Sequence, residues 1–142
     1  NDVLGHRFGD RLLRAVAERL RREAFPHQQV VLARLSGDEF AVLLSDADAS
    51  AATPVAQRIH AVLERPFVLD DHTVDLSAGI GVTVCPEHGT DADLLLSRAE
   101  VAMYAAKRSG RMQVRRYAGP GVEPEIVAPR EPQDCPDDPV AA

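Results

Sequence analysis

Two adjacent acidic residues at a tight turn are the first feature of this sequence whose side chains can do chemistry. Asp38 and Glu39 follow Ser36 and Gly37, between two apolar runs. Neighbouring side chains on a strand point to opposite faces, so the two carboxylates cannot do the same job. One can hold Mg²⁺, which prefers carboxylate oxygens together with substrate phosphates, and the other can act as a base. Gly37 allows a phosphate to approach the backbone. An ordinary solvated turn explains the same residues, because turns favour Gly, Asp and Ser.

A second polar group lies near the start of a predicted helix. Asn1 and Asp10 belong to this group. An amide and a carboxylate together match the donor and acceptor edge of guanine. Asp10 can equally cap the helix and complement its dipole, which contributes about 0.5–1 kcal/mol. The residue types alone favour the cap.

Basic side chains form a third group at the end of another predicted helix. Lys107 is the only lysine of the chain, and Arg111 follows four residues later. Both donate charge-assisted hydrogen bonds that suit phosphate oxygens, and Arg34, four residues before Asp38, can join them. Cations also complement a helix C-terminus without any ligand, so the pattern leaves both interpretations open.

The apolar spacing predicts the elements that must position these groups. The two runs around the acidic pair form a hairpin, and the helices cover the resulting sheet. We therefore expect an α/β sandwich with a mixed, largely antiparallel sheet. The predicted helices cover 9–23, 51–63 and 91–109, and the predicted strands cover 30–35, 39–44, 67–69, 74–76, 78–84 and 114–117.

Composition excludes several classes of protein. A chain of 142 residues suffices for one domain, and its net charge of −6 argues against a nucleic-acid binder. No apolar run approaches the roughly 18 residues of a membrane span. The two cysteines lie far apart and the histidines lack ligand spacing, which argues against a disulfide scaffold and a zinc site.

The last 25 residues differ from the rest in charge and composition. Residues 118–142 contain six acidic groups, one Arg and six of the ten prolines, whereas residues 1–117 are almost neutral. Such a segment buries too little apolar surface to offset its chain entropy. We predict a domain over 1–117 and a disordered, acidic, proline-rich tail over 118–142.

Four separated motifs occur in a fixed order along the predicted domain. They are NDVLGHRFGD at 1–10, ARLSGDEF at 33–40, SAGIG at 77–81 and AMYAAKRSGR at 102–111. This set closely resembles the GGDEF domain, the catalytic domain of diguanylate cyclases. The resemblance covers nearly all of residues 1–117, and the order of several motifs makes it specific.

The resemblance implies a fold like that of the class III nucleotidyl cyclases, in which helices wrap a mostly antiparallel central sheet with a ferredoxin-like core. It implies that two GTP molecules condense to cyclic di-GMP, with release of pyrophosphate, in a homodimer with facing active sites. It also implies Mg²⁺ or Mn²⁺ as the cofactor. We expect a cytoplasmic domain that an upstream sensor or regulatory domain controls, in a parent protein that can be anchored in the membrane.

The motif positions also imply roles for individual residues. By this resemblance Asp38 and Glu39 are the catalytic residues, and Asp38 is also a metal ligand. The resemblance outweighs the interpretation of the other polar groups as a helix cap or as cations at a helix end. The residues implied in substrate binding are Asn1 and Asp10 for guanine and Arg34, Gly37, Lys107 and Arg111 for the phosphates.

Three departures from the family pattern bear on activity. The family's opening strand, which carries a second metal-binding Asp, should precede Asn1, so we expect this chain by itself to be inactive and poorly stable. Ser36 replaces the first Gly of the signature, which costs on the order of 1 kcal/mol only if its φ is positive. His27 and Val30 stand where many members carry an inhibitory Arg-x-x-Asp, so we expect no product feedback there.

These departures keep an alternative function open. A degenerate domain that binds GTP, or that only contacts a partner, would regulate without catalysis. The intact acidic pair favours the cyclase.

Overall fold

The computed structural model describes residues 5–25, 29–109 and 113–127. None of the described helices is both long and apolar enough to cross a membrane. Its elements are α1 (His6–Arg19), the π-helical segment η1 (Leu20–Ala24), β1 (Val30–Ser36), β2 (Glu39–Leu44), α2 (Ala49–Glu64), β3 (Phe67–Leu69), β4 (His72–Val74), β5 (Ile80–Val82), α3 (Ala92–Arg108), β6 (Val114–Arg116) and β7 (Glu125–Val127).

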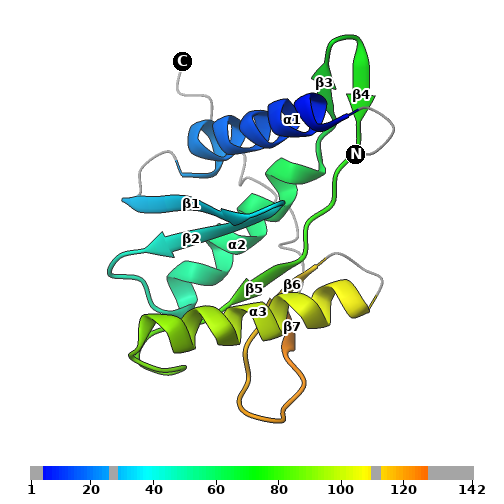
Figure 1. Cartoon of the computed structure of the whole chain (residues 1–142). Helices are drawn as coiled ribbons and strands as arrows, with labels where there is room; N and C mark the ends of the chain where they lie inside the picture. Colours follow the sequence, from blue (N-terminus) through cyan, green and yellow to red (C-terminus); the bar gives the residue numbers. More distant parts are fainter. Residues whose placement is uncertain (1–4, 26–28, 110–112, 128–142) are drawn as a thin grey trace, which may run out of the picture.

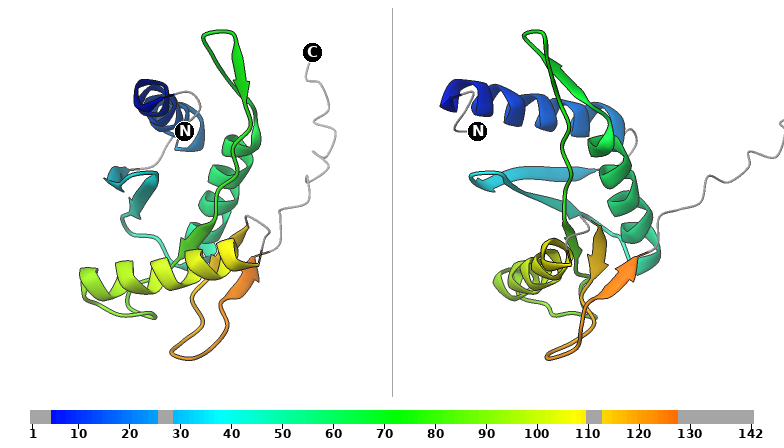
Figure 2. Two further views of the ribbon diagram at one scale, coloured as in Figure 1. Left: turned by 45° about the vertical axis from the view of Figure 1, so that its right-hand side comes forward. Right: turned by 90° about the vertical axis from the view of Figure 1, so that its right-hand side faces the viewer.

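The helices cover small sheets, as the α/β prediction requires. The β1–β2 hairpin lies between α1 and the strands β5, β6 and β7 (Figure 1), while α3 packs on β5 and β6. Helix α2 contacts η1 as well as β5 and β6 and runs along one side of the molecule (Figure 2). The predicted fold class is confirmed, with one difference. The described strands form three separate sheets, β1–β2, β3–β4 and β5–β6–β7, and β5 pairs with β6 in parallel.

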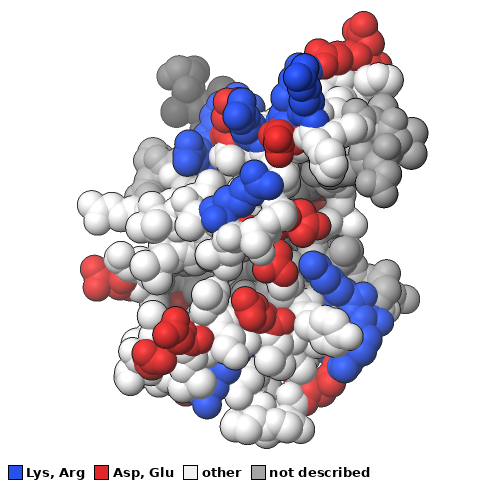
Figure 3. Space-filling model, in the orientation of Figure 1, with Lys and Arg blue, Asp and Glu red and all other residues white. Residues whose placement is uncertain are grey.

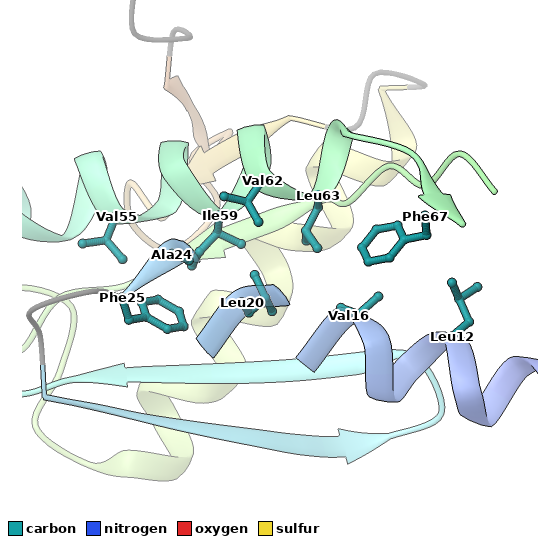
Figure 4. Packing of buried hydrophobic residues seen from close by; sticks show 10 residues of the cluster. All are labelled: Leu12, Val16, Leu20, Ala24, Phe25, Val55, Ile59, Val62, Leu63 and Phe67. Atoms are coloured by element: carbon teal, nitrogen blue, oxygen red, sulfur yellow. The ribbon is translucent and has the colours of Figure 1, made fainter. Parts of the chain in front are cut away.

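The main core forms between α1, η1 and α2. Leu12, Val16 and Leu20 recur every four residues and are all buried, so they form one apolar stripe on the first helix. This stripe faces the buried residues of α2, with Phe67 at one end of the contact (Figure 4). The hairpin residues Leu32 and Phe40 pack against the same cluster, which fixes the hairpin relative to the helices.

Arg19 joins the end of α1 to the segment that follows α2. Its guanidinium donates hydrogen bonds to the carbonyl oxygens of Arg65 at 2.6 Å and Pro66 at 2.9 Å. It also lies 3.5 Å from the centre of the Phe67 ring, which is a cation–π contact. Burial lowers the pKa of this arginine, but the backbone acceptors and the ring compensate for lost hydration.

The β3–β4 hairpin has a two-residue turn that brings a carboxylate to α1. Asp70 and Asp71 both have positive φ, the geometry of a type I′ turn, so Leu69 pairs directly with His72. The predicted second strand, 74–76, begins two residues later than β4 does. The Arg11 guanidinium donates to both carboxylate oxygens of Asp70, and this contact holds the pKa of Asp70 below its ordinary value.

Helix α2 begins two residues before the predicted start. Asp48 is its N-cap: the carboxylate accepts hydrogen bonds from the Ala51 N–H at 3.0 Å and from the Ser50 hydroxyl at 2.6 Å. Pro54 is therefore the sixth helical residue, and not part of the first turn as predicted. These hydrogen bonds, from Ser50 first and Ala51 second, lower the pKa of Asp48.

Strand β5 approaches α3 so closely that one of its positions excludes a side chain. A Cβ atom on Gly81 would lie 1.9 Å from the Ala99 carbonyl oxygen and 2.6 Å from the Met103 nitrogen. A Cβ on Gly79 would meet the Lys107 side chain at 3.2 Å, a milder contact. The glycine at 81 therefore sets the distance between the sheet and the helix that carries Lys107.

The first ten residues of the predicted tail differ from the prediction. Residues 118–127 form a loop and the strand β7, which pairs antiparallel with β6. Arg115 is buried, donates to the Pro124 carbonyl oxygen at 2.8 Å and forms an ion pair with Glu123. Backbone pairing and one buried arginine order this segment although it is poor in large apolar residues. Residues 128–142 lie outside the described residues.

We predict that Gly81→Ala lowers the free energy of unfolding by about 3 kcal/mol, because the new methyl group meets backbone atoms that cannot move independently. Gly79→Ala is the matched control and should cost about 1 kcal/mol or less, since a flexible side chain can yield. Urea unfolding followed by circular dichroism measures both. Equal losses would contradict the close approach of β5 and α3.

Asp48 should contribute to stability in a pH-dependent way. Because its pKa is lower in the folded state, the contribution is fully present above the ordinary value of 3.8 and is lost as the pH falls through the folded-state value. Asp48→Asn keeps the cap but removes the titrating group. As the pH is lowered from pH 4, the melting temperature of this variant should therefore fall less than that of the original chain. Parallel pH profiles for the two proteins would contradict this.

Candidate functional site

The acidic pair lies on the turn of the β1–β2 hairpin, as predicted. Ser36 pairs with Glu39, and the strand register shifts between Arg34 and Ser36, so a bulge precedes the turn. Asp38 is exposed, whereas Glu39 is partly buried. The two carboxylates therefore occupy different environments, and their different chemical roles remain a prediction.

Arg34 stabilises this turn from within the same hairpin. Its Nε donates a hydrogen bond of 2.7 Å to the Gly37 carbonyl oxygen. Gly37 has a φ of 50°, a conformation that costs other residues roughly 1–2 kcal/mol. The expected phosphate contact of Arg34 remains a prediction. The bond to Gly37 uses Nε, so the two terminal nitrogens can still donate to a ligand.

The serine of the signature fits the backbone of the turn. The described non-glycine residues with positive φ are Asp46, Asp70 and Asp71, and Ser36 is not among them. The condition under which a serine would strain the turn is therefore not met.

Asp10 lies on the exposed surface of α1, in its second turn. The helix begins at His6, and its N-cap is Gly5, without a side-chain cap. The interpretation of Asp10 as a helix cap is therefore wrong, because the helix starts earlier than the sequence suggested. Its carboxylate remains available to a ligand. Asn1 lies outside the described residues.

Lys107 is exposed near the C-terminal end of α3, and its aliphatic stem lies where it would meet a Cβ atom placed on Gly79. The glycines at 79 and 81 were predicted only as part of a motif, and their packing role was not foreseen. Their place within the predicted strand 78–84 was the available signal, since glycine in a strand often marks a close backbone approach. Arg111 lies outside the described residues.

The elements that carry these residues present them on the same side of the molecule. The N-terminal end of α1, the β1–β2 turn and the C-terminal end of α3 all lie on the right-hand side in Figure 1. In the part of the chain that the structure describes, no three His, Cys, Asp or Glu side chains form a ready metal cluster. The exposed Asp38 carboxylate beside Glu39 nevertheless fits Mg²⁺, which typically takes one or two carboxylates and completes its shell with phosphates and water.

Comparison with known proteins identifies the family. The family model described as "Diguanylate cyclase, GGDEF domain" matches residues 1–113, and the chain belongs to this family. It is 42% identical over 113 residues to diguanylate cyclase TpbB of Pseudomonas aeruginosa, covering 78% of this chain and 26% of TpbB. It is 43% identical over 113 residues to cyclic di-GMP phosphodiesterase PdeR of Escherichia coli, covering 80% of this chain and 17% of PdeR.

A solved structure has the same fold. The crystal structure of the TpbB GGDEF domain from Pseudomonas aeruginosa aligns with a TM-score of 0.76 and 39% identity, over 84% of this chain and 74% of that one. The chain thus spans about a quarter or less of these two curated relatives, but most of an isolated GGDEF domain.

Two substitutions at the turn test its backbone. Ser36→Gly should lower the free energy of unfolding by only about 0.4–1 kcal/mol, through the entropy of the unfolded chain. Gly37→Ala should cost about 1–2 kcal/mol, because alanine must adopt positive φ there. Urea unfolding measures both. A stability gain in Ser36→Gly would instead indicate that Ser36 strains the turn.

Proposed function

We propose that this chain is the catalytic domain of a diguanylate cyclase, which condenses two GTP molecules to cyclic di-GMP and releases two pyrophosphates. The observation that carries the proposal is the acidic pair Asp38 and Glu39, on a turn whose backbone Gly37 and Arg34 stabilise. Membership of the GGDEF family supports the reaction class. The acidic net charge of the chain is compatible with a small-molecule substrate and gives no support for a nucleic-acid partner.

In the proposed mechanism each domain binds one GTP and two domains face each other as a homodimer. Each 3′-hydroxyl forms a bond to the α-phosphate of the other GTP, while the bond to pyrophosphate breaks. Glu39 accepts or orients the hydroxyl proton, and Asp38 lies where it can hold the cation. When bound, Mg²⁺ or Mn²⁺ neutralises phosphate charge. Catalysis therefore rests mainly on orientation and electrostatics.

The remaining site residues serve binding in this proposal. Asp10, together with Asn1, contacts the guanine edge, which requires an acceptor for its N–H groups. Lys107 and Arg111 bind the phosphates, with Arg34 as a further donor on the hairpin. GTP as substrate places the domain in the cytoplasm, and the larger size of the relatives supports an additional regulatory domain in the same protein.

A second candidate function is GTP binding without condensation. The observation that favours it is the comparable identity to PdeR, whose name denotes a phosphodiesterase and not a cyclase. In that case the domain would regulate a partner through nucleotide occupancy. Binding of a GTP analogue without product formation distinguishes this function from the cyclase.

The test uses the chain extended upstream of Asn1 to include the expected opening strand, incubated with GTP and Mg²⁺. We expect cyclic di-GMP by chromatography, and a rate at least about 100-fold lower in Glu39→Gln, which cannot accept a proton. The control Asp46→Asn changes a carboxylate on the loop after β2 and should keep the rate.

Titration calorimetry with a non-hydrolysable GTP analogue accompanies the assay. Binding without product would favour the second candidate. The absence of binding in the extended chain would overturn both functions.

A further inference from the structure

A small hollow between α1 and the β1–β2 hairpin combines an apolar floor with a cationic rim. It has a volume of about 130 Å³. Its floor consists of apolar residues of α1 and the hairpin, and its rim of arginines from α1, η1 and the hairpin. The lining residues are Leu13, Ala17, Leu32 and Phe40 on the floor and Arg14, Arg21 and Arg34 on the rim.

No described carboxylate neutralises the charge of the rim arginines. Among the described residues, Arg14 and Arg21 form no ion pair and both are exposed. Arg34 uses Nε on the Gly37 carbonyl, and its terminal nitrogens donate to no other described residue. Glu18 lies between Arg14 and Arg21 in the sequence, and it does not line the hollow. Figure 3 shows basic side chains gathered over α1.

These properties indicate which kind of ligand the hollow can bind. Pockets for drug-sized ligands have volumes of about 300–1,000 Å³, so a hollow of about 130 Å³ takes one side chain and not a nucleotide. An apolar floor suits an apolar side chain, and guanidinium groups pair bidentately with carboxylates. The matching ligand is an acidic peptide segment with one apolar residue.

The chain contains such a segment. Residues 128–142 carry four carboxylates and one arginine. Asp137 and Asp138 come directly before Pro139 and Val140, which places two acids beside an apolar pair. We propose that residues 131–140 bind in the arginine-rimmed hollow of the same chain.

The hollow is within reach of this segment. Val127, at the end of β7, packs against the same small cluster as Leu44 of β2. Leu44 pairs with Val30, and Leu32 on the hollow floor lies two residues further along β1, about 7 Å away. An extended chain covers roughly 3.3–3.6 Å per residue, so the ten residues from 127 to 137 span about 33–36 Å.

Occupancy would couple the acidic segment to the signature turn. A carboxylate that pairs side-on with Arg34 accepts from Nε as well as from one terminal nitrogen, so it competes with the Gly37 carbonyl for Nε. Loss of that hydrogen bond frees the turn that carries Asp38 and Glu39. The contact itself does not depend on the proposed nucleotide chemistry.

The test places a nitroxide spin label on Cys135, within the segment, in the full chain with Cys85→Ser. Cys85 is exposed and free, so its replacement removes only the second labelling site. Without any nucleotide, the amide signals of residues 13–21 and 32–40 should lose intensity relative to the reduced label. The loss should disappear at about 1 M salt, where the Debye length is roughly 3 Å.

Two neighbouring arginines provide the matched control. Arg21→Glu reverses a charge on the rim and should abolish the selective signal loss. Arg22→Glu reverses an exposed charge beside it, outside the hollow, and should preserve the loss. Equal behaviour of the two variants would overturn the proposal.

A mixing experiment tests whether the contact is within one chain. Isotope-labelled chain with Cys85→Ser and Cys135→Ser is combined with unlabelled, spin-labelled chain, and no selective loss is expected. The same loss in the mixture assigns the contact to a second copy and overturns binding within the chain. No selective loss in the singly labelled protein overturns the site altogether.

Discussion

The packing of α1 and η1 against α2 is the contact on which the rest of the described structure depends. The buried stripe of α1 meets the apolar face of α2, and the hairpin residues Leu32 and Phe40 pack on the resulting cluster. The position of the acidic turn therefore depends on a core that contains none of the turn's own side chains. A domain of this size has few alternative apolar clusters, and the second one here is smaller and lies around α2, β5 and β6.

Arginine side chains connect loop segments that lie outside the apolar core. Arg19, Arg34 and Arg115 each donate to a backbone carbonyl oxygen, at Pro66, Gly37 and Pro124 respectively. The planar guanidinium offers five donors in a fixed geometry, so one side chain can satisfy a carbonyl and retain donors for another partner. Loops in this chain are thus held by charge-assisted bonds to backbone, and the surplus donors leave cationic surface beside them.

The hairpin and its acidic pair could be predicted from the sequence because both follow from local rules. Strand alternation and the residues of a tight turn act within a few positions, and the structure places the turn between Ser36 and Glu39 as expected. Element boundaries were less accurate. The start of α2 depended on the cap at Asp48, and the start of α1 preceded Asp10, which removed the capping role assigned to that carboxylate.

By itself the sequence determined the chemistry available to this protein: a carboxylate pair on a glycine-containing turn, a lone lysine late in a helix, and an acidic C-terminal segment. Only the tertiary structure decided which distant segments meet. It turned Arg14 and Arg21 toward a hollow beside the hairpin, brought Ala99 onto Gly81, and paired residues 125–127 with β6. Local patterns record burial and turn preference along the chain. Contacts between segments depend on how the helices pack, and a single sequence does not encode that packing in its local spacing.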